Sequence, residues 1–69
     1  MEDFATRLKE LRIEKGLSQV QLSKATGMSR SVIGYWESGK KHPTSPAIIT
    51  LAKYFNVTTD YLLGVTDNY

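Results

Sequence analysis

Cysteine is absent from this sequence of 69 residues, and proline occurs only twice. Without cysteine the chain has no disulfide and no thiolate metal ligand. It also lacks an apolar run near its beginning that would form a signal peptide or a membrane span. We therefore expect a cytoplasmic protein with no metal, no cofactor and no membrane partner.

Residues that support catalysis are equally scarce. The single histidine, His42, has no second metal ligand at a useful spacing, and Ser18, Ser29 and Ser45 stand where helix caps are expected. A chain this short builds one small core and no deep cleft. We expect a single domain over residues 1–69 that works through its surface, without enzyme activity and without a small-molecule ligand.

Charge is unevenly distributed, although its sum is only +2. Residues 1–45 contain eight basic and five acidic side chains, a net charge of +3, whereas residues 46–69 contain one basic and two acidic side chains, a net charge of −1. The first two thirds of the chain therefore favour an anionic partner.

Strand patterns are missing too, whereas helix signals recur along the whole chain. The sequence predicts helices over about residues 3–15, 19–26 and 30–38, a fourth from a Ser45 cap to about Asn56, and a short fifth helix that Gly64 ends. Helices this short are marginal alone and must pack together. We expect an all-α, compact five-helix orthogonal bundle in which residues 65–69 fray.

The second and third helices are separated by a very short turn. Ser18 and Gln21 have the spacing of a capping box, Gly27 supplies a left-handed helix exit, and Ser29 begins the next helix. At 100° per residue, Ile33 and Trp36 of this third helix point inward.

The outward face of the third helix carries five polar or small residues: Arg30, Ser31, Gly34, Tyr35 and Ser38. Glycine inside a helix costs about 1 kcal/mol relative to alanine, so Gly34 suggests close approach of a partner. The major groove of B-DNA admits one helix. Arg30 and Ser31 would then contact base edges, and Tyr35 a base edge or a phosphate, with Gly34 at a place of close approach.

Phosphate contacts are expected around this face. The helix starts at Gln19 and Ser29 aim backbone N–H groups outward, and Lys40, Lys41 and His42 follow the third helix. The alternative is a solvated helix face followed by a solvated basic loop.

Two opposite charges stand at the edges of apolar stripes. Arg12 follows Leu8 by four residues, and Glu37 follows Ile33 by four. We predict a partly buried, bidentate ion pair between Arg12 and Glu37 that joins the first helix to the third. Alternatively, each side chain reaches water independently.

Two segments together carry a resemblance to a known family: "GLSQVQLSKATGMSRSVIGYWESGKKHP" and "LAKYFNVTTDYLLG". Through them the chain resembles the lambda-repressor-like helix-turn-helix family, also called Cro/repressor or Xre-type. The resemblance covers about residues 4–64. Its markers are specific in combination: Gln19, Gly27, Ile33, Trp36, Glu37 and Gly39.

This resemblance implies an arginine–glutamate link at Arg12 and Glu37. It also implies phosphate contacts at Gln19, Ser29 and Ser38, and base contacts at Arg30, Ser31 and Tyr35. The sequence departs from the family at two positions. Ser23 replaces the usual alanine where the motif helices cross. Gly34 replaces a larger polar residue, so that one base contact is either missing or made by approach of the backbone.

The resemblance further implies a transcriptional regulator, a repressor above all, that binds a palindromic double-stranded DNA operator as a homodimer. The dimerisation candidates lie near the last helix: Tyr61, Leu63, Val65 and Tyr69. The alternative is that these residues only cover a small core. A second hypothesis is a helical protein-interaction module or an antitoxin-type partner-binding protein, which an exposed Trp36 would favour.

Overall fold

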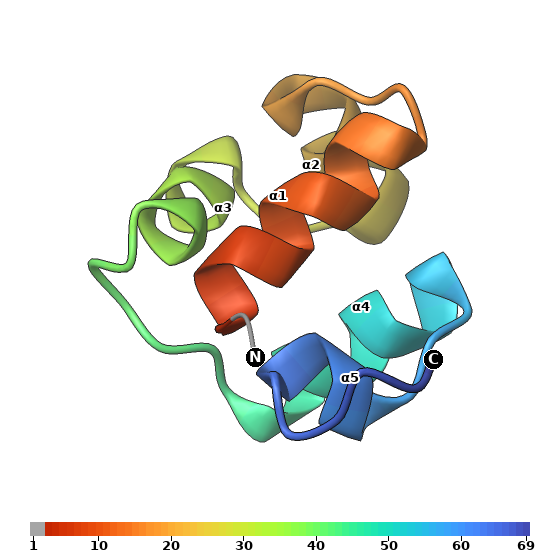
Figure 1. The fold of residues 1–69 in the computed structure, drawn as a ribbon. Helices are drawn as coiled ribbons and strands as arrows, with labels where there is room; N and C mark the ends of the chain where they lie inside the picture. Colours follow the sequence, from red (N-terminus) through yellow and green to blue (C-terminus); the bar gives the residue numbers. More distant parts are fainter. Residues whose placement is uncertain (1–2) are drawn as a thin grey trace.

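The computed structural model describes residues 3–69, which form five helices and the segments that connect them (Figure 1). The helices are α1 Phe4–Glu14, α2 Gln19–Thr26, α3 Arg30–Glu37, α4 Ser45–Phe55 and α5 Thr59–Leu63. Since residues 3–69 contain no strand, the predicted all-α five-helix bundle is confirmed. Within the same range, no helix has the length and apolar character needed to cross a membrane.

Capping hydrogen bonds fix the starts of α2 and α3, and a glycine makes the turn between them. The Ser18 hydroxyl accepts from the N–H of Gln21 at 3.0 Å, and the Gln21 side chain accepts from the N–H of Ser18 at 2.8 Å, forming the predicted capping box. Gly27 ends α2 with a φ of 75°, which glycine adopts without steric cost. The Ser29 hydroxyl then accepts from the N–H of Val32 at 3.1 Å and caps α3.

The start of α4 differs from the prediction by one residue. Thr44, not Ser45, is the N-cap, because its hydroxyl accepts from the N–H of Ala47 at 3.3 Å. The Ile48 N–H bonds to the Thr44 carbonyl at 3.0 Å, so Ser45 already belongs to the first turn. Pro46 is tolerated in this turn because the first N–H groups of a helix have no helical acceptor.

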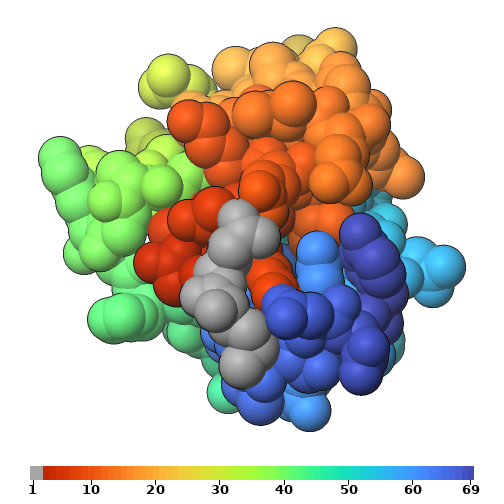
Figure 2. Space-filling view, viewed as in Figure 1, coloured from red at the N-terminus to blue at the C-terminus, as the bar shows by residue number. Residues whose placement is uncertain are grey.

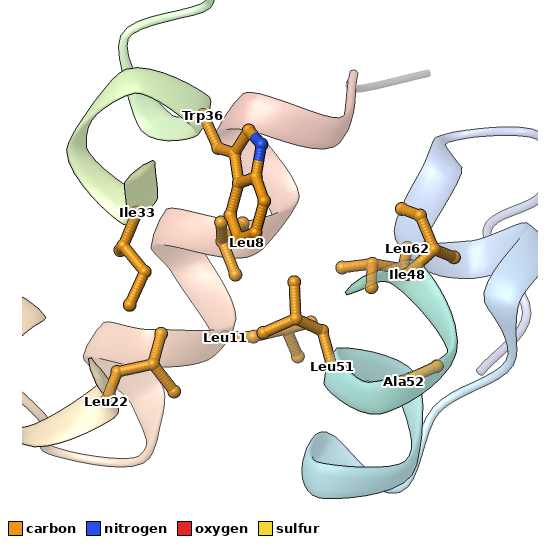
Figure 3. Packing of buried hydrophobic residues seen from close by; sticks show 9 residues of the cluster. All are labelled: Leu8, Leu11, Leu22, Ile33, Trp36, Ile48, Leu51, Ala52 and Leu62. Carbon is orange, nitrogen blue, oxygen red and sulfur yellow. The ribbon is translucent and has the colours of Figure 1, made fainter. Parts of the chain in front are cut away.

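The core is built by side chains from all five helices. Leu8 and Leu11 of α1 lie between the buried side chains of α2 and α3 and those of α4 and α5 (Figure 3). Trp36 is buried and meets the edge of Phe4, with ring centroids 6.1 Å apart. The buried apolar residues are Leu8, Leu11, Leu22, Ile33, Trp36, Ile48, Leu51, Ala52 and Leu62. This packing turns the opposite face of α3 toward solvent.

Arg7 is a buried charge that the sequence analysis missed. It is only 2% exposed, and its guanidinium donates to the carbonyls of Tyr61, at 2.8 Å, and Thr66 and to the carboxylate of Asp67. The guanidinium also lies over the Tyr61 ring, 4.1 Å from its centroid. The signal was present in the sequence, since Arg7 lies three residues after Phe4 on the apolar face of α1.

The C-terminal tail, residues 65–69, for which we expected fraying, lies against the bundle in the structure. The Tyr69 ring stacks on Tyr61 with centroids 4.5 Å apart, and the Tyr69 carbonyl accepts from the N–H of Thr58 at 3.0 Å. Burial raises the pKa of Tyr61, and its hydrogen bond with Tyr69 adds to this shift. Two of the groups that accept hydrogen bonds from Arg7, the Thr66 carbonyl and the Asp67 carboxylate, therefore belong to the tail.

Candidate nucleic-acid interface

The outward face of α3 is accessible in the structure. Arg30, Ser31, Tyr35 and Ser38 are exposed, whereas Ile33 and Trp36 of the same helix are buried. The end of α3 and the loop after it project from one side of the molecule, away from the C-terminal tail (Figure 2). The tail therefore leaves this face open.

An open depression brings most of the predicted contact residues together. Its lining comes from the start of α2, the outward face of α3 and the loop that follows. The residues that line it are Gln19, Arg30, Ser31, Gly34, Tyr35, Ser38 and Lys40. All four candidate base-contacting residues belong to this set, and so do three of the six candidate phosphate-contacting residues.

The other three phosphate candidates lie outside that depression. Ser29 is exposed at the N-cap of α3, and its hydroxyl accepts a hydrogen bond from the N–H of Val32. Lys41 and His42 line a different hollow, which also includes Phe4 and Trp36. The structure therefore separates His42 from the surface formed by α3.

Gly34 is not required by the packing of the bundle. A Cβ atom built on Gly34 would meet only Oε1 of Gln19, at 3.7 Å, which is an ordinary contact distance. Gly34 has no left-handed conformation, and an alanine at a helix interior is favoured by about 1 kcal/mol. The missing side chain thus leaves space on the outside of α3.

Arg12 and Glu37 form the predicted bidentate ion pair. Arg12 Nε and Nη2 donate to Glu37 Oε2 and Oε1 at 2.7 and 2.9 Å. The two side chains are only 11% and 5% exposed, so they do not reach water independently. The hydrogen bonds with Glu37 raise the pKa of Arg12.

This ion pair also fixes the start of α2. Arg12 Nη1 donates to the carbonyl of Leu17 at 2.8 Å, and Gln19 Nε2 donates to Glu37 Oε1 at 3.2 Å. One buried cluster therefore joins α1, the α1–α2 loop, α2 and the last turn of α3. It holds Gln19 beside Gly34, on the depression that the contact candidates line.

The dimerisation candidates fall into two groups. Tyr61 and Tyr69 stack on each other, and Tyr61 also faces Arg7. Leu63 and Val65 are 44% and 61% exposed, so Leu63 is not a core residue. Leu63 shares a shallow apolar hollow with Ile49, which the sequence analysis did not select.

Comparisons with known proteins agree with this geometry. The family described as Helix-turn-helix matches residues 8–62. The HTH-type transcriptional activator BcrR of Enterococcus faecalis is 41% identical over 62 residues, covering 90% of this chain and 30% of BcrR. The HTH-type transcriptional regulator YobD of Bacillus subtilis is 34% identical over 65 residues, covering 94% of this chain and 58% of YobD.

Two solved structures share the fold. The restriction-modification controller protein C.AhdI from Aeromonas hydrophila has a TM-score of 0.78 and 37% identity, covering 86% of this chain and 89% of C.AhdI. The P22 c2 repressor, in complex with a synthetic operator, has a TM-score of 0.84 and 27% identity, covering 91% of this chain and 96% of the repressor chain.

The fold and this surface define a helix-turn-helix protein, in which α3, the second helix of the motif, exposes its polar face to solvent. The chain belongs to the helix-turn-helix family of transcription regulators, of the lambda-repressor-like type. That family is not an enzyme class. The chain spans 30% of BcrR and 58% of YobD, so these relatives contain further sequence that it does not match.

Proposed function

We propose that this chain binds double-stranded operator DNA in a sequence-specific manner, with α3 in the major groove. The observation that carries the proposal is the open depression, in which the start of α2 and the outward face of α3 meet. Gly34 leaves room there for close approach, although the bundle does not need a glycine at this position. The similar P22 c2 repressor was solved in complex with a synthetic operator, which supports operator binding by this chain.

The proposal divides the residues in and around the depression into base contacts and phosphate contacts. Arg30 reads a guanine through O6 and N7, Ser31 bonds to a base edge, and Tyr35 reaches a base or a neighbouring phosphate. The helix starts at Gln19 and Ser29 direct N–H groups to the phosphate backbone, to which Ser38, Lys40 and Lys41 add further contacts. His42 contributes only at the periphery, because it lines a different hollow.

The second part of the proposal is a homodimer on a palindromic site. One recognition helix reads few base pairs, and two of them about 34 Å apart match successive turns of the major groove. Leu63 and Val65 are exposed and available for this contact, whereas Tyr61 and Tyr69 serve it less directly because they pack on each other. Light scattering that shows a monomer both free and on a palindromic duplex would contradict the dimer.

Regulation by this chain is proposed to be repression, in which the bound protein blocks RNA polymerase at a promoter. The P22 c2 protein is named a repressor, whereas BcrR is named an activator. A transcription assay on a promoter that contains the selected site separates the two. Lower transcript yield with added protein supports repression, and higher yield supports activation.

Binding of a protein partner is the competing function. An exposed Trp36 would have favoured that hypothesis, but Trp36 is only 5% exposed. A mobility-shift titration on random duplex DNA over a salt series discriminates the two functions. DNA binding must weaken steeply with salt because phosphate contacts release counterions, and an absence of binding at low salt would overturn the proposal.

Selection of bound duplexes from a random DNA pool is the decisive experiment. The proposal predicts an enriched, twofold-symmetric site whose half-sites are about one helical turn apart. Recovery of an unenriched pool would show that the chain does not read sequence.

A further inference from the structure

The segment that follows α3 holds Tyr35 through both its backbone and its side chain. Gly39 adopts a φ of 78° and turns the chain back on the helix, so the N–H of Lys40 bonds to the Tyr35 carbonyl at 2.9 Å. The Ser38 hydroxyl donates to the same carbonyl at 3.1 Å. The backbone of Tyr35 is thus fixed by the segment that follows α3.

The side chain of Tyr35 is held from the same direction. The returning chain brings Nζ of Lys41 over the Tyr35 ring, 4.9 Å from the centroid. An ammonium group above an aromatic face is attracted by the ring quadrupole. Tyr35 nevertheless remains 41% exposed and lines the depression on the α3 face. Its ring is therefore oriented before any partner arrives.

We propose that Lys41 is a positioning residue for base recognition, acting through the ring of Tyr35. Lys41 covers part of the ring, which restricts the rotamers of Tyr35 and directs its free edge and hydroxyl into the major groove. This inference rests on the proposed function and adds to it that a loop lysine determines base preference. A lysine that only contacted phosphate would affect all sequences alike.

Lys40 provides a matched control in the same loop. It carries the same charge one residue away and lines the depression, and its side chain has no ring contact among the described residues. Replacing either lysine by methionine removes one charge and preserves most of the length of the side chain. The two variants therefore differ in whether the support of Tyr35 is lost.

The test is selection from a random DNA pool with the wild-type chain and with Lys40→Met and Lys41→Met. We expect Lys40→Met to weaken binding to every sequence and to leave the selected site unchanged. Lys41→Met is expected to reduce preference at one base pair per half-site by about two- to fivefold, in proportion to a lost exposed cation–π contact. Lys41→Arg should restore the preference, since arginine also binds aromatic faces.

The same preference change must disappear when Tyr35 is absent. In a Tyr35→Leu background, Lys41→Met should no longer alter the selected site. If Lys41→Met instead matches Lys40→Met, with uniform weakening and an unchanged site, the positioning role is wrong and Lys41 is a phosphate contact only. If the wild-type chain enriches no site at all, the proposed function itself fails, which is a different result.

A measurement without DNA tests the contact itself. Ring currents should shift the side-chain methylene protons of Lys41 upfield of those of Lys40 in the NMR spectrum, and Tyr35→Leu should abolish the difference. Equal shifts for the two lysines in the wild-type chain would overturn the proposal.

Discussion

Two arginines of α1 hold two different regions of this molecule. Arg12 binds Glu37 and the Leu17 carbonyl, and thereby supports the helix-turn-helix half. Arg7 binds two carbonyls and Asp67, and thereby supports α5 and the tail. The first buried charge stabilises the proposed DNA surface, whereas the second closes the opposite side of the bundle. Buried arginines in one helix can thus serve separate tasks.

Loss of the Arg12 partner should produce the largest effect. Glu37→Ala leaves a guanidinium that is 11% exposed without its carboxylate, so the free energy of unfolding should fall by about 3 kcal/mol. Melting of Arg12→Ala, Glu37→Ala and the double variant measures the coupling between them. Simple additivity of the two losses would show that the pair contributes no mutual stabilisation.

Loss of Arg7 should be the next largest effect on stability, and its local structural consequences should lie in α5 and the tail. Arg7→Met removes charge-assisted hydrogen bonds and should lower the free energy of unfolding by about 2 kcal/mol. Exchange of the Thr58 N–H, which bonds to Tyr69, should accelerate. Lys9→Met, at an exposed position of α1, is the control. An unchanged melting temperature would contradict the role of Arg7.

A change on the DNA surface itself should affect recognition without affecting the fold. Arg30→Ala should reduce discrimination at one base pair by about 2 kcal/mol, because a bidentate contact to guanine is lost. Lys40→Ala should weaken binding to all duplexes and reduce the salt slope by about one. Competition binding with single-base variants of the selected site measures both. An equal loss on every sequence from Arg30→Ala would refute base reading by Arg30.

The smallest effect should have opposite signs for stability and for binding. Gly34→Ala should raise the free energy of unfolding by about 1 kcal/mol, since the added Cβ meets only Gln19 at 3.7 Å. The same methyl group should weaken binding to the selected duplex, because it occupies the space left for the partner. Thermal melting and a mobility-shift titration check the two effects. A decrease in stability would mean that the bundle itself requires Gly34.

Sequence patterns predicted the helix-turn-helix half better than the other half. Capping residues and apolar spacing located α2 and α3, and complementary charges at stripe edges indicated Arg12 and Glu37. The position of Arg7 on the apolar face of α1 indicated burial, but two of its partners are backbone carbonyls, which no residue type marks. The start of α4 was ambiguous, since Thr44 and Ser45 are both good caps.

The positions of the side chains after α3 could not be predicted from the sequence either. The run of Lys40, Lys41 and His42 predicted a basic loop, but its direction depends on the left-handed turn at Gly39 and on the bond from Lys40 to the Tyr35 carbonyl. Charge alone therefore grouped three residues that the structure separates onto two hollows.

Chemical-shift mapping with the selected duplex tests the central proposal most directly. Amide signals of the chain are followed by NMR while the duplex is added. The account predicts the largest changes at the start of α2 and along the outward face of α3, at Gln19, Arg30, Ser31, Gly34 and Tyr35. Largest changes on α1 and the C-terminal tail, with α3 unaffected, would contradict it.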